Sequence, residues 1–284
     1  MLYPLLWTVS ASFSNPVSIR QGKLWLLPVG FQLQGYKLVC SDNELLTGYA
    51  NSLFYMVAGT AINIFMTIIA AYPLSCREFG MRKLFTLMIT LTMWFNGGII
   101  PYYLLMKSLN LLNTVWSVLV SGAISAWNMI IMRNYFMTSI LEGIREAAKI
   151  DGAGRFKQVI HVTLPAICRN VGYLFRIAIR LSGPIIAVMV VFYGVGRWND
   201  YFNTMIYISN RKLYPLQLFL REILIVNQLT AMQQTADSTM NQMILAAESV
   251  KYAAVIMASV PVLILYPFVQ RYMLKGIMIG AVKG

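Results

Sequence analysis

The sequence has little of the material that soluble enzymes use for chemistry. Its 284 residues include ten acidic residues, one histidine and three cysteines. Cys40, Cys76 and Cys168 are far apart, odd in number and form no CxxC pair, which argues against a disulfide framework and a zinc site. His161 alone leaves few groups for acid–base catalysis. We therefore expect neither a catalytic centre nor a metal site.

Charge of either sign is also scarce. Charged residues make up 12% of the chain, about half the usual share. Hydrophobic residues make up 58%, and the mean hydropathy is +0.63. This composition indicates a membrane protein. The 23 Lys and Arg residues, against ten acids, indicate positive loops that face the cytoplasm and anionic lipid, and no nucleic-acid partner is expected.

Long windows without charge predict the membrane spans, and they are 45–76, 84–106, 108–132, 181–196 and 252–270. A helix needs about 20 apolar residues to cross a hydrocarbon core of about 30 Å. The first three windows are long enough, and 252–270 is just adequate. Window 181–196 is short and needs residues from one or both sides. The N-terminal "MLYPLLWTVSASF" is 13 residues long, and we interpret it as the outer part of a first span whose beginning is absent.

These windows predict an all-α, polytopic membrane protein with about six transmembrane helices, the first of them incomplete. Residues 1–284 then form one transmembrane domain. If residues 145–166 are cytoplasmic, more than half of the Lys and Arg residues fall on the inner side. Residues 14–47 and 200–247 are then the outer loops.

A charged stretch, "REAAKIDGAGRFKQVIHVTLPA" at 145–166, lies between predicted spans. Its small residues predict a short helix that a partner can approach closely. Asp151-Gly152 stops a helix, because glycine tolerates the left-handed turn. A second amphipathic run follows and ends at Leu164-Pro165. The spacing is Glu146-Ala147-Ala148, three residues, Gly152, nine residues, Val162, one residue, Leu164-Pro165.

This spacing resembles the EAA loop of the permease subunits of bacterial ABC importers, with Val162 in place of an isoleucine. Other segments resemble the carbohydrate-uptake branch, the maltose-type second permease, and are most similar to permeases for complex oligosaccharides such as alginate importers. These segments include "AAYPLSCREF", "NGGIIPYYLLMKSLNLLNT", "NMIIMRNYF", "GVGRWNDYFNTMIYI", "LYPLQLFLREIL" and "YPFVQRYMLKGIMIGAVKG". The resemblance covers nearly the whole chain.

The resemblance implies a multi-pass permease of the bacterial cytoplasmic membrane that imports oligosaccharides. The implied partners are a second permease subunit in a heterodimer, an ATPase dimer, an extracytoplasmic solute-binding protein and membrane lipid. The loop at about 140–166 is implied to be a coupling helix that docks on the ATPase. By motif position, the coupling residues are Glu146, Ala147, Ala148, Asp151, Gly152, Leu164 and Pro165.

No nucleotide-binding motif accompanies the loop. A P-loop needs GxxxxGK followed by Ser or Thr, whereas Gly22-Lys23 has Val17 at the first glycine position and Leu24 at the last position. We therefore expect a non-enzymatic chain without a cofactor of its own, and ATP and Mg bound by the partner ATPase.

Residues 196–207, "GRWNDYFNTMIY", place aromatic rings and amides at the outer end of a predicted span. One interpretation is an aromatic belt at the membrane interface. The other is a sugar-lining surface, since sugars favour flat rings and amide hydrogen bonds. An acid at membrane depth is costly without a purpose, which favours the second. The candidate residues on the substrate path are Trp198, Asn199, Asp200, Tyr201 and Asn203.

Residues 166–180 form an insert that the family pattern lacks between Leu164-Pro165 and "LSGPII". Arg169, Arg176 and Arg180 fall on one helical stripe. We expect a helix near the cytoplasmic membrane surface that leads into window 181–196. The competing interpretation is that the insert is not ordered and the span begins at 182–184.

Two other functions remain open from the residues alone. The first is a scaffold or signalling subunit that docks a partner through the 145–166 stretch, and the second is a permease for a non-sugar solute. The carbohydrate-type segments argue against the second. Substrate-dependent ATP hydrolysis by a reconstituted complex distinguishes a permease from the first.

Overall fold

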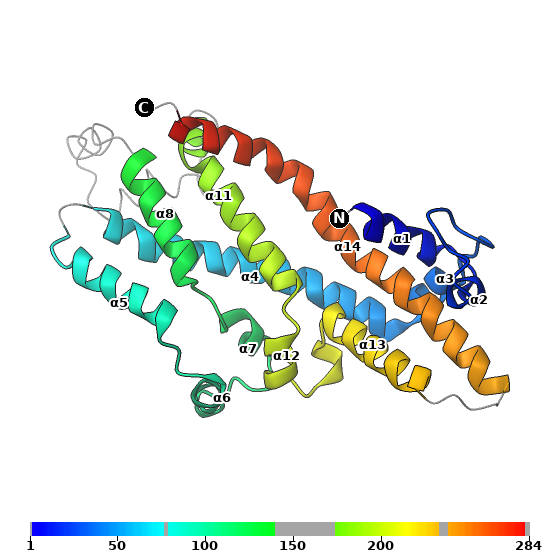
Figure 1. Ribbon diagram of the computed structural model, residues 1–284. Helices are drawn as coiled ribbons and strands as arrows, with labels where there is room; N and C mark the ends of the chain where they lie inside the picture. The colour runs from blue at the N-terminus through cyan, green and yellow to red at the C-terminus, as the bar shows by residue number, and fades with distance from the viewer. Residues whose placement is uncertain (1, 77–78, 140–173, 233–237, 282–284) are drawn as a thin grey trace. The chain divides into compact units, whose positions relative to one another are not determined.

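The computed structural model describes residues 2–76, 79–139, 174–232 and 238–281. Within these residues all regular secondary structure is helical and there is no strand, which confirms the all-α prediction. Figure 1 shows the helices, which in chain order are α1 (Leu2–Ser12), α2 (Pro16–Arg20), α3 (Gln34–Ser41), α4 (Asn43–Ser75), α5 (Arg82–Trp94), α6 (Ile99–Ser108), α7 (Val115–Val120), α8 (Ala126–Ser139), α11 (Leu174–Trp198), α12 (Phe202–Tyr207), the 3-10 turn η2 (Arg211–Leu213), α13 (Leu216–Met232) and α14 (Ser238–Ala281).

Two helices in the described part of the chain are long and apolar enough to cross a membrane. They are α4 and the 18-residue segment Ala247–Ile264 of α14. A third span is present if α5 and α6, which meet at 114°, count as one broken span. The predicted number of about six spans therefore stays a prediction.

The predicted window 84–106 is broken in its middle. The chain leaves α5 at Trp94 and enters α6 at Ile99. Gly98 between them has φ 85°, and its N–H donates to the side-chain oxygen of Asn96 at 3.0 Å. Glycine adopts positive φ at no steric cost, so this short Asn-Gly-Gly segment supports a sharp turn inside an apolar window.

The helix that contains window 181–196 extends beyond it at the N-terminal side, as expected for a window too short to span a membrane. α11 begins at Leu174 and continues to Trp198 through Pro184. The helix therefore includes residues 174–180 of the predicted insert helix. Residues 166–173 of that insert lie outside the described residues.

The described residues group into two compact units, and each unit draws on three separate stretches of the chain. The predicted single domain is neither supported nor opposed by this grouping. The first unit takes residues from Met1–Tyr55, Leu111–Val118 and Trp198–Ile264, and the second from Met56–Asn110, Leu119–Arg197 and Leu265–Gly284.

The first unit has a small core near the N-terminus. Ala11, Ile19 and Leu24 are buried there. Trp7 of α1 meets Tyr252 of α14 edge to face, with ring centroids 5.6 Å apart. The N-terminal residues therefore pack as a helix against α14.

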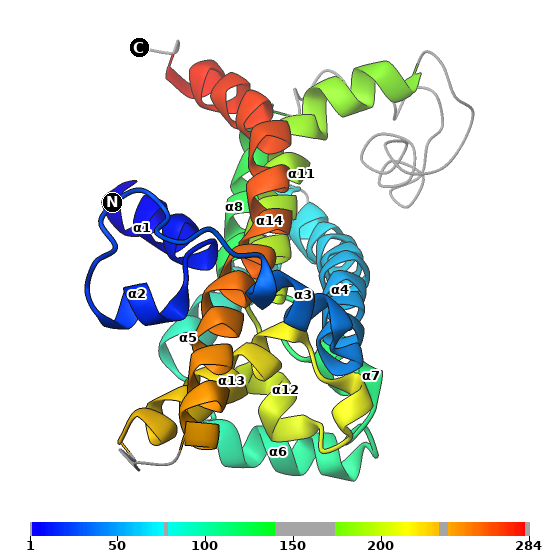
Figure 2. The same cartoon turned by 90° about the vertical axis from the view of Figure 1, so that its right-hand side faces the viewer.

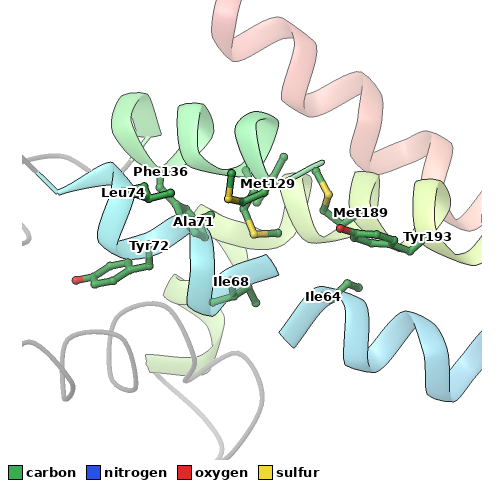
Figure 3. Close-up of a cluster of buried hydrophobic side chains, with 11 residues drawn as sticks. Ile64, Ile68, Ala71, Tyr72, Leu74, Met129, Phe136, Met189 and Tyr193 are labelled. Atoms are coloured by element: carbon green, nitrogen blue, oxygen red, sulfur yellow. The ribbon is translucent and has the colours of Figure 1, made fainter. Parts of the chain in front are cut away.

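The second unit is organised around side chains from α4, α8 and α11, which converge in Figure 3. Each helix contributes apolar residues spaced three or four apart, the period that places them on one helix face. The buried residues that show this spacing are Ile64, Ile68 and Ala71 on α4, Met129, Met132 and Phe136 on α8, and Ile185, Met189 and Tyr193 on α11.

Candidate functional site

Trp198, the first candidate on the predicted substrate path, is a packed side chain at the end of α11. Only 1% of it is exposed. Its indole N–H donates to the carbonyl of Ala258 at 2.9 Å, and its ring meets Tyr49 edge to face at 5.6 Å. These contacts join the end of α11 to α4 and α14 within the first unit. Trp198 thus anchors the segment that carries the other candidates.

Asp200 and Asn203 form a local pair where α12 begins. The side-chain amide of Asn203 donates to both carboxylate oxygens of Asp200, at 3.0 and 2.9 Å. The backbone N–H of Asn203 also donates to the first oxygen at 3.3 Å. The Asp200 carboxylate is therefore hydrogen-bonded locally and shapes the entry into α12.

Tyr201 comes directly before α12, which packs against α13 (Figures 1 and 2). Arg221 of α13 places its guanidinium 5.7 Å from the centroid of the Tyr201 ring. One of its nitrogens also contacts the sulfur of Met205. The Tyr201 and Phe202 side chains are 39% and 43% exposed. We name Tyr201, Phe202, Met205 and Arg221 the Tyr201–Arg221 surface.

The chemistry of this surface suits a sugar ring that carries an acid. An aromatic ring presents a flat apolar face, and exposed Asn199 lies two residues before Tyr201 in the chain. The Arg221 guanidinium is planar, always charged and holds five donors in a fixed fork that matches a carboxylate. Arg221 was not predicted from the sequence. The signal that could have found it is the lone Arg-Glu pair inside the apolar "LYPLQLFLREIL".

Asn113 holds the connection between α12 and α13 on one side, through its side-chain oxygen and its backbone N–H. Asn113 has φ 60°, and its side-chain oxygen accepts from the N–H groups of Ser209 and Asn210 at 3.1 and 2.8 Å. The backbone N–H of Asn113 donates to the carbonyl of Tyr207 at 2.8 Å. One asparagine therefore fixes the end of α12 against the segment that precedes α7.

The first half of α4 holds the same connection from another direction. The Asn51 amide donates to the carbonyls of Lys212 and Tyr214 at 2.8 and 3.0 Å. The Tyr55 hydroxyl donates to the carbonyl of Leu213 at 2.9 Å. These bonds fix residues 207–214 and, with them, the approach of α12 to α13 that forms the Tyr201–Arg221 surface.

An exposed ion cluster lies on the same connection. Arg211 contacts Glu44 at 2.8 Å and Glu222 at 3.1 Å, and its guanidinium lies 5.3 Å from the Phe219 ring centroid. The hydrogen bond that Arg211 donates to Glu44 raises the pKa of Arg211 above its ordinary value. Exposed ion pairs contribute little to stability, so this cluster orients the loop more than it stabilises it.

The predicted coupling residues Glu146, Ala147, Ala148, Asp151, Gly152, Leu164 and Pro165 lie outside the described residues. Among residues that the structure does describe, there is no group of three or more His, Cys, Asp or Glu side chains placed to hold a metal ion. Of the path candidates, the structure pairs Asp200 with Asn203, sets Tyr201 beside Arg221, leaves Asn199 exposed and buries Trp198. Their role in a substrate path stays a prediction.

Comparison with known proteins finds relatives along the full chain. Protein LplC of Bacillus subtilis is 37% identical over 283 residues, which cover 100% of this chain and 90% of LplC. The polygalacturonan/rhamnogalacturonan transport system permease protein YtcP of the same organism is 34% identical, covering 99% of this chain and 92% of YtcP. No family model matches the chain.

A solved structure is also similar. It is the crystal structure of a bacterial ABC transporter involved in the import of the acidic polysaccharide alginate. One of its chains superposes with a TM-score of 0.78 at 33% sequence identity, covering 95% of this chain and 90% of that chain.

Proposed function

This chain belongs to the permease subunits of carbohydrate ABC transporters, which are integral membrane proteins, and we propose that the sugars it imports are acidic oligosaccharides. YtcP is named for polygalacturonan and rhamnogalacturonan, and the similar structure for alginate. All three names describe polymers that contain sugar rings with carboxylates. The observation that carries the proposal in this chain is the Arg221 guanidinium beside the exposed Tyr201 ring.

The Tyr201–Arg221 surface supplies two complementary contacts for such a sugar. The Tyr201 ring stacks on the apolar face of the pyranose, and the Arg221 fork donates to the ring carboxylate. Charge-assisted hydrogen bonds of this kind are about twice as strong as neutral ones. The Asp200 carboxylate accepts hydrogen bonds from the side-chain amide of Asn203, which reduces its repulsion of an incoming anion.

The energy for transport comes from partner subunits in this proposal. The chain is a transport permease without catalysis, and a partner ATPase dimer binds ATP and Mg and hydrolyses the nucleotide. Residues 140–166 dock on that ATPase and transmit its closure to the spans. A second permease subunit completes the pathway, and an extracytoplasmic binding protein delivers the oligosaccharide.

Competition for uptake tests the substrate class. The complete importer, reconstituted in vesicles with ATP inside, takes up a labelled trigalacturonate. We expect unlabelled oligogalacturonates to compete and neutral arabino-oligosaccharides of equal length to compete at least tenfold more weakly. Equal competition by the neutral sugars would contradict the proposed substrate class and leave the family assignment intact.

Arg221→Gln tests the residue that carries the proposal. A hydrogen bond to a charged group contributes about 1.5–3 kcal/mol, and 1.4 kcal/mol is a tenfold change in an equilibrium constant. We expect half-saturation for the acidic oligosaccharide to rise about tenfold or more. Lys107→Gln is the matched control, because it removes one exposed positive charge from α6. An equal effect of both substitutions would assign the change to net charge and overturn the role of Arg221.

A further inference from the structure

The predicted span 108–132 is interrupted within its length. α7 ends at Val120 and α8 begins at Ala126. Between them Gly122 has φ 66°, a conformation that interrupts the helix. In a hydrocarbon environment, backbone groups freed by such a break need partners from neighbouring helices, because no water reaches them. We refer to residues 121–125 as the break.

A carbonyl in the last turn of α7 and a carbonyl inside the break receive hydrogen bonds from α11 and α4. Arg197 donates through one terminal nitrogen to the carbonyl of Leu119 at 3.0 Å. The Asn63 amide donates to the carbonyl of Gly122 at 3.2 Å. The same Arg197 nitrogen also donates to the side-chain oxygen of Asn63 at 2.8 Å. The two side chains thus link three parts of the second unit.

A second set of bonds repeats this arrangement one helical turn away. Tyr193 is four residues before Arg197 on α11, and Thr67 is four residues after Asn63 on α4. The backbone N–H of Ser125 donates to the Tyr193 hydroxyl oxygen at 3.2 Å. The Tyr193 and Thr67 hydroxyls lie 2.7 Å apart. We name Asn63, Thr67, Tyr193 and Arg197 the polar node.

Space for the arginine is provided by Gly59 of α4. A Cβ at this position would lie 2.9 Å from Nε of Arg197 and 3.1 Å from its Cδ. Arg197 is 7% exposed and Asn63 is 2% exposed. The packing of α4 is therefore shaped to admit a long cationic side chain into the interior of the second unit.

Stability alone does not account for a buried arginine. Apolar residues of similar volume are often as stabilising as buried ionic groups or more so, and ionisable residues inside membrane segments are costly and mark functional positions. Interrupted helices are also where membrane transporters place their solute pathways. The node joins such a break to α11, whose first residue, Leu174, follows soon after Pro165 of the predicted coupling loop. From Leu174 to Arg197 a helix rises about 35 Å at 1.5 Å per residue.

We propose that Arg197 is a positioning residue for transport. Through the polar node it ties the break in the 108–132 span to α4 and α11, so that a displacement of α11 moves the break with it. Arg197 does not touch the sugar; it sets the geometry of the backbone at residues 121–125. The inference rests on the proposed function, because it assumes that the loop before α11 receives the motion of the ATPase.

Uptake per ATP hydrolysed tests this role in the complete importer. Arg197→Met keeps the length of an apolar stem and removes the donors, and Lys107→Met removes an exposed charge as the control. We expect Arg197→Met complexes to assemble and hydrolyse ATP while the sugar moved per ATP falls at least tenfold. The control keeps the ratio of the wild-type complex. A ratio within twofold of wild type for Arg197→Met would overturn the proposal.

Further variants separate positioning from simple structural support. Both described donations from Arg197 leave from one nitrogen, so the ammonium of Arg197→Lys can replace them, and we expect it to recover part of the ratio. The double variant Asn63→Leu with Arg197→Met should move no less sugar per ATP than Arg197→Met alone, and so should the single variant Asn63→Leu. The two substitutions remove the same hydrogen-bond network, so their losses should not add. Additive losses would contradict a shared node.

Asn63→Asp covers the case in which Arg197→Met fails to assemble. It keeps an oxygen for Arg197 and removes the donor to Gly122, so the complex should assemble with a lowered ratio. If neither variant assembles, the node is structural support only and the positioning role is wrong. The wild-type complex separates the two proposals. If it imports only neutral oligosaccharides, the proposed substrate class fails, while the ratio is still measured with the sugar that is imported.

Discussion

At the scale of single residues, hydrogen-bonding partners decide what each polar side chain does. Trp198 was expected on the sugar path, and the structure uses its indole N–H to bind the carbonyl of Ala258, sixty residues further along. Arg197, its neighbour in the chain, is buried and bonds to Asn63. The sequence predicts that both residues lie at the end of a span. It does not show these partners, because each partner lies on another helix.

Gly59 provides a test at this scale. Gly59→Ala places a Cβ 2.9 Å from Arg197 Nε, and overpacking a filled interior costs roughly 1–3 kcal/mol. We expect the melting temperature of the purified complex to fall by several degrees. Gly196→Ala is the matched control, since it is also helical and nothing lies within 4 Å of its added Cβ. A melting temperature that is unchanged by Gly59→Ala would show that the Arg197 side chain moves aside with no loss of stability.

At the scale of helices, the charge-free windows predicted where apolar helices lie and did not predict where they break. Windows 84–106 and 108–132 both contain an interruption, next to Gly98 and Gly122, which have positive φ. Hydropathy counts apolar side chains, whereas a break depends on whether other residues satisfy the backbone. The glycines were visible in the sequence, but the partners of the second break, Asn63, Tyr193 and Arg197, come from two other helices.

The connection between α12 and α13 gives a second test. Asn113→Ala removes the oxygen that accepts from Ser209 and Asn210. It also places a less tolerant residue at φ 60°, where left-handed geometry costs about 1–2 kcal/mol. We expect faster protease cleavage within 208–214. Asn113→Asp keeps an acceptor and tolerates the same geometry, so it should cleave at the wild-type rate. Equal rates in all three proteins would contradict the proposed role of Asn113.

At the scale of the whole molecule, the sequence predicted the family better than it predicted the site. Motif spacing along nearly the whole chain pointed to an importer permease, and relatives that cover 99–100% of the chain bear this out. The predicted coupling residues at 146–165 lie outside the described residues, so their role remains a proposal. The Tyr201–Arg221 surface was only half visible, because Arg221 is brought to Tyr201 by the packing of α13 on α12.

Gly152→Val tests the coupling loop in the assembled importer. A β-branched residue resists the positive φ expected after Asp151. We expect the variant to insert and assemble, to bind the sugar-loaded binding protein, and to lose uptake while ATP hydrolysis continues. Gly280→Val, near the end of α14 and far along the sequence from the loop, is the control. Normal uptake by Gly152→Val would contradict the coupling role of this position.

The most direct measurement of the central claim is ATP-driven uptake of an acidic oligosaccharide by vesicles that contain the complete importer, compared with vesicles that lack only this chain. We expect uptake that requires this chain, ATP hydrolysis by the partner subunit and the binding protein together. The purified chain alone should hydrolyse no ATP. Equal uptake without this chain, or ATP hydrolysis by the chain alone, would contradict the account.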